Sequence, residues 1–307
     1  MKSLTIFTPT YNRAYILPQL YDSLKRQTSL DFCWLIVDDG STDYTQDIVE
    51  SWIQEGLIDI LYYYQENGGK ERAHNYGAAL TTTELFMCCD SDDYLTDDAV
   101  AVILKRWQGF GNKSDDICGI IGPRAVYNNG IKIKGKIPHC YETMKYRDFT
   151  NKIGKIKETF VVLKTNILRE NPYPVQKGER FIPIGFLYHK LDQHYVMLTI
   201  EQELMICNYL SDGETKNGVK WFVENPKGMA ISRNEMTMRE GFTFKGIKGI
   251  IDYIAASLIA KKSFSRFVSE SNAKVMTLIL LPLGIIRSRI LIKKYKKMTN
   301  EGYNIVT

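Results

Sequence analysis

Apolar and polar residues alternate along the N-terminal third of the chain in blocks that predict strands and helices in turn. Buried strands are predicted at residues 3–8, 32–37, 58–64 and 85–89, where apolar, β-branched and aromatic residues cluster. The first of these strands is expected to end at Pro9. Between the strands, apolar residues recur at helical spacing over residues 16–27, on a face with Ile48, Val49, Trp52 and Ile53, and over residues 73–80. This alternation predicts an α/β fold with a parallel sheet covered by helices.

The pattern is less regular after a helical stretch at residues 102–107. Short strands are predicted at residues 117–122, 125–127, 131–133 and 160–163, with a hairpin turn at Asn128-Asn129-Gly130. Prolines at 172, 174 and 183 mark irregular chain, and a helix near residues 186–195 and strands at 197–200 and 203–210 follow. No internal repeat or low-complexity run is present.

Polar clusters follow three of the predicted strands: residues 8–13, 38–43 and 90–93. Ligands of such sheets bind outside the carboxyl ends of the strands, so one crevice is expected to gather all three clusters. Asp90, Asp92 and Asp93 place three carboxylates within four positions, where like charges repel unless a cation neutralises them. Hard oxygen ligands at this place suit Mg²⁺ or Mn²⁺ shared with a phosphate. The alternative is an acidic loop that caps the next helix, since Asp97 and Asp98 follow.

Missing motifs disfavour several classes of protein. Neither Gly-x-Gly-x-x-Gly nor the Gly-Lys-Ser/Thr phosphate loop occurs, which argues against a dinucleotide dehydrogenase and a P-loop nucleotidase. None of the six cysteines forms a Cys-x-x-Cys pair, and His189 and His194 do not share a helical face, so zinc is disfavoured. The start at Met1-Lys2-Ser3 shows no signal peptide, and a reducing cytosol is expected.

The net charge of +5 is unevenly distributed along the chain. Residues 242–307 carry 12 Lys/Arg against 3 Asp/Glu, whereas residues 1–241 carry 28 against 32. Within this basic tail, residues 275–286 are nearly all apolar, but Pro282 and Gly284 interrupt them. They are too few to span a membrane, which takes about twenty residues.

Short apolar segments beside a basic cluster suit the surface of an anionic membrane, and a peripheral membrane contact through residues 242–307 is the favoured interpretation. One alternative is a helical hairpin packed on the main domain with its charged face in solvent. Another is a nucleic-acid contact, which the long apolar runs of the tail argue against.

The clusters at the three strand ends resemble the motifs of family 2 glycosyltransferases, the nucleotide-sugar enzymes of the GT-A fold. Thr8-Pro9-Thr10-Tyr11-Asn12-Arg13 is similar to the family's opening motif, Val37–Asp43 to its second motif, and Asp90-Ser91-Asp92-Asp93 to its Asp-x-Asp metal motif. The resemblance covers about residues 1–105 and implies a Rossmann-like mixed sheet flanked by helices. We therefore predict a GT-A domain at residues 1–241, with a nucleotide-sugar half (1–105) and an acceptor half (106–241). A helical, basic extension follows at residues 242–307.

The resemblance implies a role for each matching residue. Tyr11 lies against the base, with the Pro9 backbone nearby. Asp38 or Asp39, with Asp39 preferred, accepts a hydrogen bond from the base. The Asp-x-Asp motif is expected to contact the ribose and the metal. Asp90 is expected near the ribose, and Asp92 is expected to ligate the metal that bridges the diphosphate. Asp93 is expected to assist as a metal ligand.

Neighbouring residues complete the implied donor site: Arg13, Lys70, Arg72 and Ser91. Lys70, in Asn67-Gly68-Gly69-Lys70, resembles a variant found in polysaccharide-building members and is expected to reach a phosphate or the base. Arg72 is the second candidate for that contact. His74 stands where many members have Arg, which leaves the local contact open.

The resemblance implies an inverting transfer from a nucleotide-diphosphate sugar, most simply a UDP-sugar, with Mn²⁺ or Mg²⁺ as cofactor. The acceptor is expected to be a glycan or a lipid-linked saccharide in capsular or cell-envelope polysaccharide synthesis, at the inner face of the cell membrane. Candidate bases are Glu179, with Asp192 and Glu158 behind it. Members of a similar bacterial subgroup often have Glu where this chain has Ile184, so a non-catalytic nucleotide-sugar-binding protein is the alternative.

Overall fold

The computed structural model describes residues 2–110, 114–128, 131–133, 141–153, 158–208, 218–241 and 243–300. Contacts divide the chain into two units. The first comprises residues 1–172 and 194–211, and the second comprises residues 173–193 and 212–307. The functional division expected after residue 241 stays a prediction.

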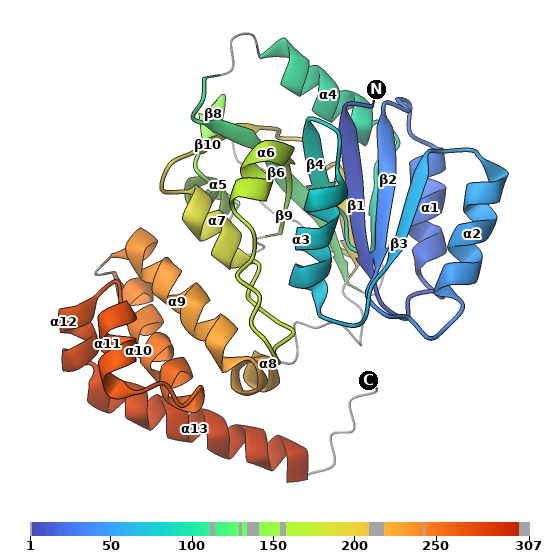
Figure 1. The fold of residues 1–307 in the computed structure, drawn as a ribbon. Coiled ribbons are helices and arrows are strands. Elements are labelled where there is room, and N and C mark those ends of the chain that lie inside the picture. The colour runs from blue at the N-terminus through green and yellow to red at the C-terminus, as the bar shows by residue number, and fades with distance from the viewer. Residues whose placement is uncertain are drawn as a thin grey trace. The chain divides into compact units, whose positions relative to one another are not determined.

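Four parallel strands form one part of the sheet in the first unit, in the order β3-β2-β1-β4 (Figure 1). The strands are β1 (Leu4–Thr10), β2 (Phe32–Asp38), β3 (Ile60–Tyr64) and β4 (Leu85–Cys88). The helices between them are α1 (Leu17–Lys25), α2 (Thr45–Glu55) and α3 (Lys70–Leu80). The predicted alternation is confirmed, and each strand directs its carboxyl end to the same edge of the sheet.

Pro9 was expected to end the first strand, but it lies inside β1, where it pairs in register with Val37. Phe7 accepts a hydrogen bond from Cys89 on the β4 side, and the ladder to β4 ends at Phe7. Because backbone groups alternate sides along a strand, the nitrogen of Pro9 faces the β4 side, as Phe7 does, beyond the point where the ladder to β4 has ended. Its missing N–H therefore costs no ladder hydrogen bond.

The sheet becomes mixed beyond β4. β9 (Thr159–Lys164) pairs antiparallel with β4 and with β6 (Ile117–Asn128), and β10 (Val196–Thr199) is parallel to β6. The remaining strands are short: β5 (Asp93–Leu95), β7 (Ile131–Ile133), β8 (Thr143–Met144) and β11 (Met205–Asn208). The two strands predicted at residues 117–122 and 125–127 are one strand, β6. Asn129 and Gly130 of the predicted turn lie outside the described residues.

Helices α1, α2 and α4 (Ala99–Gly109) pack on one face of the sheet through a continuous apolar core. At its centre Trp34 of β2 stacks on Trp52 of α2 with ring centroids 5.8 Å apart, and Tyr21 of α1 stacks on Trp52 at 4.3 Å. Such aromatic pairs stabilise a core beyond their buried area. Ile53, expected on the inner face of α2, is 42% exposed instead, because the buried stripe runs through Val49 and Trp52.

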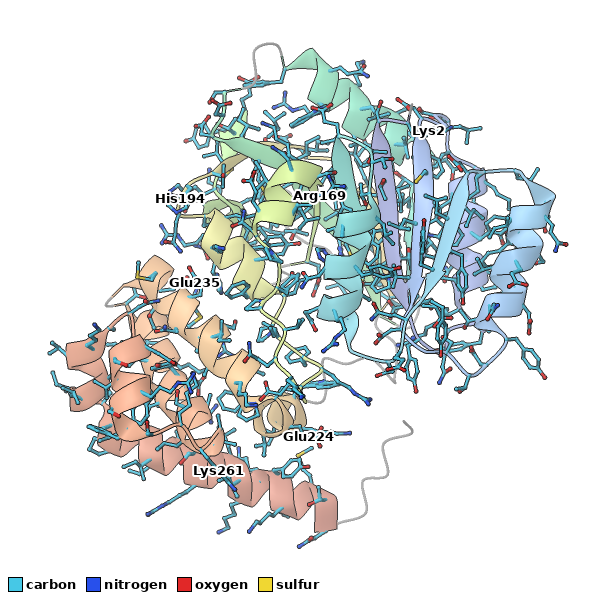
Figure 2. The ribbon with its side chains drawn as sticks, in the orientation of Figure 1. Lys2, Arg169, His194, Glu224, Glu235 and Lys261 are labelled. Carbon is cyan, nitrogen blue, oxygen red and sulfur yellow. The ribbon has the colours of Figure 1, made fainter. Side chains whose placement is uncertain are left out.

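The other face of the sheet is covered by α3, where Gly77 lies so close to Phe7 that an added Cβ would meet its ring at 2.3 Å. Arg169 of α6 (Thr165–Glu170) donates to the carbonyl oxygen of Ala78 at 2.9 Å, near the end of α3 (Figure 2). A cation at this end of a helix satisfies its last carbonyl groups. A short helix, α5 (Tyr146–Lys152), completes the first unit.

The second unit is helical. Its helices are α7 (Gly185–Leu191), α8 (Gly218–Glu224), α9 (Pro226–Glu240), α10 (Phe244–Ile259), α11 (Phe264–Glu270), α12 (Lys274–Ile279) and α13 (Leu281–Asn300). Ile250, Ile254 and Ala255 form a buried face of α10, and Asp252 on the same helix accepts from Arg287 of α13 at 2.8 Å. Glu224 accepts from Tyr295 at 2.8 Å, and Glu235 accepts from Gln193 (Figure 2). The expected helical C-terminal region is therefore present.

No described helix combines the length and the apolar character that crossing a membrane demands. The apolar run at residues 275–286 is divided between α12 and α13, with the break at Leu280 two residues before Pro282. Proline disfavours helical backbone in the residue before it and removes a donor, so helices end close to such positions.

Candidate active site

The loops after β1 and β2 are joined through Asn12. Its backbone is left-handed (φ 51°), a conformation that asparagine tolerates better than most residues. The Asn12 N–H donates to Ser41 Oγ at 2.8 Å, and its side-chain oxygen accepts from the N–H of Thr42 at 2.7 Å. The loop that carries Tyr11 and Arg13 is thereby held against the loop that follows β2.

Asp38, the last residue of β2, has both carboxylate oxygens occupied. Oδ1 accepts from the N–H of Ser41 and Oδ2 from the hydroxyl of Tyr62, each at 2.7 Å. Burial raises the pKa of Tyr62, and the hydrogen bond to Asp38 raises it further, so the hydroxyl stays a donor. Asp38 is 1% exposed and organises the loop from inside.

Asp39 connects β2 to the segment that precedes α3. Its Oδ1 accepts from Gln65 Nε2 at 2.6 Å and from the N–H of Gly68 at 2.8 Å, and its Oδ2 accepts from the N–H of Gly69 at 2.8 Å. Hydrogen bonds to a charged acceptor are stronger than neutral ones. Asp39 is 5% exposed against 1% for Asp38, and its Oδ2 accepts one hydrogen bond, so of the two aspartates Asp39 is the more accessible to a ligand.

Lys70 extends this chain of contacts to the end of β4. It is the first residue of α3, directly after Gly69, and its ammonium lies 2.6 Å from Asp90 Oδ1. Both side chains are 29% exposed, so the pair is open to solvent on one side. The helix was predicted to begin near residue 73, and its earlier start is what places Lys70 at this point.

Their surroundings shift the pKa values of Asp90 and Asp92 in opposite directions. Burial raises the pKa of Asp90, but Lys70 and Arg124 outweigh it and hold the pKa below its usual value. Burial also raises the pKa of Asp92, and Asp90 adds to the rise while Arg13 opposes it. Of these two carboxylates, Asp92 is therefore the one whose ionised form gains more from an added cation.

Asp93 is paired within the fold. It is 2% exposed, and its carboxylate lies 2.6 Å from the guanidinium of Arg124 on β6. Burial raises the pKa of Asp93 to about 7, although Arg124 opposes the shift. This pairing favours a structural role, and the expected assistance of Asp93 to a metal stays a prediction. The sequence signal for Arg124 was a lone charge inside an apolar strand.

Among the described residues, no three His, Cys, Asp or Glu side chains gather as a metal site complete in itself. Asp90 and Asp92 nevertheless fit a divalent cation shared with a diphosphate, because Mg²⁺ is typically held by one or two carboxylates and the substrate's phosphates. The raised pKa of Asp92 indicates the same need for positive charge.

The structure thus brings the three predicted polar clusters together at one edge of the sheet. The ring of Tyr11 is 39% exposed there, and Ser91 is buried. The Arg72 side chain folds over Gly68, where an added Cβ would meet it at 2.5 Å. Pro9 lies on β1 immediately before this edge. The individual roles expected of these residues stay predictions.

His74 lies one turn after Lys70 and points into the fold. Its ring packs edge-on against Phe7 and Phe86, with centroids 5.6 and 5.2 Å away. Burial lowers the pKa of His74 to about 3, and Lys70 lowers it further while Asp90 opposes. At the position where family members often carry a cation, this chain therefore has a neutral ring that packs against the core.

We expect His74 to make the fold acid-sensitive. The unfolded chain takes up a proton near pH 6.5 and the folded chain near pH 3, so stability falls as the pH drops through this window. The loss between pH 7 and pH 4.5 should be about 2 kcal/mol. Urea unfolding of His74→Gln should show a correspondingly smaller loss, and His194→Gln, at an exposed position, should behave like the parent chain. Equal acid sensitivity in all three proteins would contradict the assignment.

The predicted bases Glu179 and Asp192 belong to the second unit. Both oxygens of Glu179 accept backbone N–H groups, from Lys227 at 2.9 Å and Gly228 at 2.8 Å, at the start of α9. This is the arrangement of a carboxylate that caps a helix N-terminus. Asp192 is 5% exposed at the end of α7, and Ile184, at the start of the same helix, is 44% exposed.

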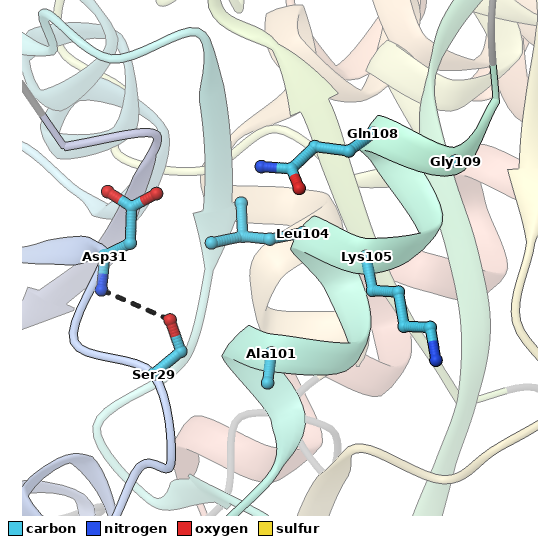
Figure 3. Close-up of a pocket in the computed structure, with 7 residues that line it drawn as sticks. All are labelled: Ser29, Asp31, Ala101, Leu104, Lys105, Gln108 and Gly109. Carbon is cyan, nitrogen blue, oxygen red and sulfur yellow. Dashed lines mark hydrogen bonds between the residues drawn. The ribbon is translucent and has the colours of Figure 1, made fainter.

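A depression of about 560 Å³ lies elsewhere on the first unit (Figure 3). It is bordered by Ser29 and Asp31, which precede β2, and by Leu104, Lys105 and Gln108 of α4. Because Ser29 and Asp31 lie at the amino end of β2, this hollow is at the opposite edge of the sheet from Asp38 and Asp39. It is not the predicted donor site.

A sequence model of a known protein family matches this chain. The model of glycosyl transferase family 2 matches residues 5–173, more than half of the chain. The chain belongs to glycosyl transferase family 2, as the three motifs indicated.

Curated relatives match over the N-terminal region. Teichoic acid poly(glycerol phosphate) polymerase of Staphylococcus epidermidis is 32% identical over 124 residues, which is 40% of this chain and 16% of that protein. Validoxylamine A glucosyltransferase of Streptomyces hygroscopicus subsp. jinggangensis is 40% identical over 92 residues, 29% of this chain and 21% of that protein. The matched region spans about a sixth to a fifth of the length of these relatives.

Solved structures are similar over nearly the whole chain. S. aureus TarS 1-349 in complex with UDP-GlcNAc has a TM-score of 0.59 at 15% identity, covering 98% of this chain and 92% of that one. The mannosyltransferase PcManGT from Pyrobaculum calidifontis, in complex with GDP-Man and Mn²⁺, has a TM-score of 0.53 at 15% identity and covers 93% of this chain and 86% of that one. These likenesses confirm the predicted GT-A fold.

Proposed function

We propose that this chain is an inverting, metal-dependent glycosyltransferase. It moves a sugar from a nucleotide-diphosphate donor, most simply a UDP-sugar, to a hydroxyl of a glycan or lipid-linked acceptor. The observation that carries the proposal is the continuous set of contacts from Asn12 through Asp39 and Lys70 to Asp90, which joins the ends of β1, β2 and β4. The complexes of two structural neighbours with UDP-GlcNAc and with GDP-Man and Mn²⁺ support the donor class.

The residues at this edge of the sheet contact different parts of the donor. Tyr11 offers an exposed ring for the base, and Asp39 Oδ2 accepts a hydrogen bond from it. Lys70 reaches the phosphates once a donor competes with Asp90 for its ammonium. Asp90 and Asp92 hold Mn²⁺ or Mg²⁺, which neutralises the charge that builds up on the leaving diphosphate.

A carboxylate base must take the proton from the acceptor hydroxyl as it attacks the anomeric carbon from the opposite face. Both oxygens of Glu179 are occupied by the backbone of α9, which favours a structural role for it and keeps Asp192 as an alternative proposed base. Glu158, the third candidate, belongs to the first unit with the donor residues.

The helix-capping role of Glu179 predicts a specific result for Glu179→Gln. Turnover should stay within about threefold of the parent, while the free energy of unfolding falls by about 1–2 kcal/mol, because the amide nitrogen opposes one of the two N–H groups. Steady-state rates and urea unfolding measure the two quantities. Glu170→Gln, an exposed change, is the matched control. Loss of turnover with unchanged stability would instead support Glu179 as the catalytic base.

The function is tested by thermal-shift screening of UDP-, GDP- and CDP-sugars with and without Mn²⁺, followed by transfer of labelled sugar from the donor that stabilises the chain. Metal-dependent stabilisation and transfer are expected. The exposed Ile184, where related chains often have Glu, favours a second candidate, a nucleotide-sugar-binding protein without activity. Stabilisation by the donor with neither hydrolysis nor transfer would support it.

Capsular or cell-envelope polysaccharide synthesis is the proposed setting, at the inner face of the cell membrane. The relative named as a teichoic acid polymerase is consistent with a cell-envelope acceptor. Transfer assays with lipid-linked saccharides, compared with soluble oligosaccharides, distinguish the acceptor classes.

A further inference from the structure

The outward side of α12 and α13 carries an unusual number of exposed apolar side chains. Six of them are 42–70% exposed and together are called the apolar stripe: Val275, Leu278, Ile279, Leu283, Ile286 and Ile290. Apart from the adjacent pair Leu278 and Ile279, they follow one another at steps of three or four residues, the spacing of neighbours on one side of a helix. The other side is closed, with Gly284 against Ile254 of α10 and Leu291 in the core of the unit.

The charge on the same two helices is entirely positive. The exposed residues Lys293, Lys294, Lys296 and Lys297 follow the apolar stripe on α13, exposed Arg289 lies just before its last member, and Lys274 precedes the stripe. Residues 274–300 include no Asp or Glu. The outward face is therefore apolar along its first part and basic along its second.

This distribution discriminates between possible occupants of the face. A second copy of the chain would bring two wholly basic helices together with no acidic partner on either. A nucleic acid would satisfy the lysines but leave the apolar stripe in water. An anionic lipid surface satisfies both parts, because the stripe enters the acyl boundary while the lysines meet the headgroups.

We propose that the apolar stripe and the basic second half of α13 dock on the surface of an anionic phospholipid membrane. The 20-residue α13, about 30 Å long, lies along the interface and does not cross it. Each lysine near such a surface adds to the electrostatic attraction. This proposal does not depend on the sugar chemistry of the first unit.

The test is co-sedimentation of the full chain with phosphatidylcholine vesicles that contain or lack phosphatidylglycerol. The parent chain should bind the anionic vesicles, and binding should fall as salt is raised. Ile286→Ser/Ile290→Ser and Lys293→Glu/Lys297→Glu should each lower the partition coefficient at least about tenfold. Leu57→Ser and Lys105→Glu, exposed changes in the first unit, should leave it unchanged. Thermal unfolding verifies that every variant is folded.

Three results would overturn the proposal. The first is equal binding to both vesicle types, or binding that neither pair of changes reduces. The second is a dimer in sedimentation equilibrium without lipid that Ile286→Ser/Ile290→Ser dissociates. The third is duplex DNA that binds as tightly as the anionic vesicles. Each leaves the glycosyltransferase proposal intact, because donor binding and transfer to a soluble acceptor are measured without lipid.

Discussion

Replacing Asp92 with asparagine should lower the rate of metal-dependent sugar transfer by about 10³-fold, or about 4 kcal/mol in activation free energy. The side chain keeps an oxygen of similar size at the same place, but it loses the negative charge that holds a divalent cation beside the diphosphate. Initial rates of UDP release, measured across a Mn²⁺ titration, should show a lower maximum and a higher requirement for metal.

Asp97→Asn is the matched control for this change, because the Asp97 side chain is 59% exposed and pairs with Arg26 on the surface. It should leave the rate and the metal requirement unchanged. The Asp-x-Asp interpretation depends on the difference between the two variants. If Asp92→Asn turned over with an unaltered response to Mn²⁺, residues 90–93 would be an acidic loop that caps the following helix, the alternative weighed from the sequence.

The sequence predicted the strands of the sheet well where burial is continuous and less well where local signals compete. β6 was predicted as two strands because Gly122-Pro123 has the composition of a break. The strand continues because β9 approaches it closely. A Cβ on Gly119 would meet the carbonyl oxygen of Val162 at 1.9 Å, and one on Gly122 would meet the ring of Phe160 at 2.4 Å. These glycines are needed for sheet packing, and that need becomes visible only when β9 is in place.

The candidate site could be predicted as motifs but not as a network. Asp39 was identified from its position after β2, yet its partners Gln65, Gly68 and Gly69 lie 26–30 residues further along the chain. Gly40 shows the same limit, because its left-handed backbone (φ 89°) lies against the N–H of Asn67, 2.9 Å from where a Cβ would stand. Periodicity finds elements, and motifs find strand ends. Pairings between loops follow from tertiary packing.

Arg124 is the clearest residue that sequence reasoning missed, and its replacement should have the largest effect on stability. Arg124→Met leaves the Asp93 carboxylate, 2% exposed, without its cationic partner. Breaking a buried ion pair on one side costs about 3–5 kcal/mol while the remaining charge stays ionised and desolvated. Because burial already raises the pKa of Asp93 to about 7, urea unfolding at pH 9 measures the loss. We expect Asp93→Asn/Arg124→Met to recover at least about 2 kcal/mol of it, since neither charge then remains.

The pH dependence of the Arg124→Met deficit provides an independent check. Burial already raises the pKa of Asp93 to about 7 against the opposition of Arg124, so removing Arg124 raises that pKa further. A carboxyl whose folded pKa exceeds its unfolded value binds its proton more tightly in the folded chain, so the deficit should shrink as the pH falls from 9 to 6. A deficit below about 1 kcal/mol, or one that grows on acidification, would contradict the pairing.

The double variant also decides what Asp93 does, because retained Mn²⁺-dependent transfer assigns it to the fold and leaves Asp90 and Asp92 as the proposed metal ligands.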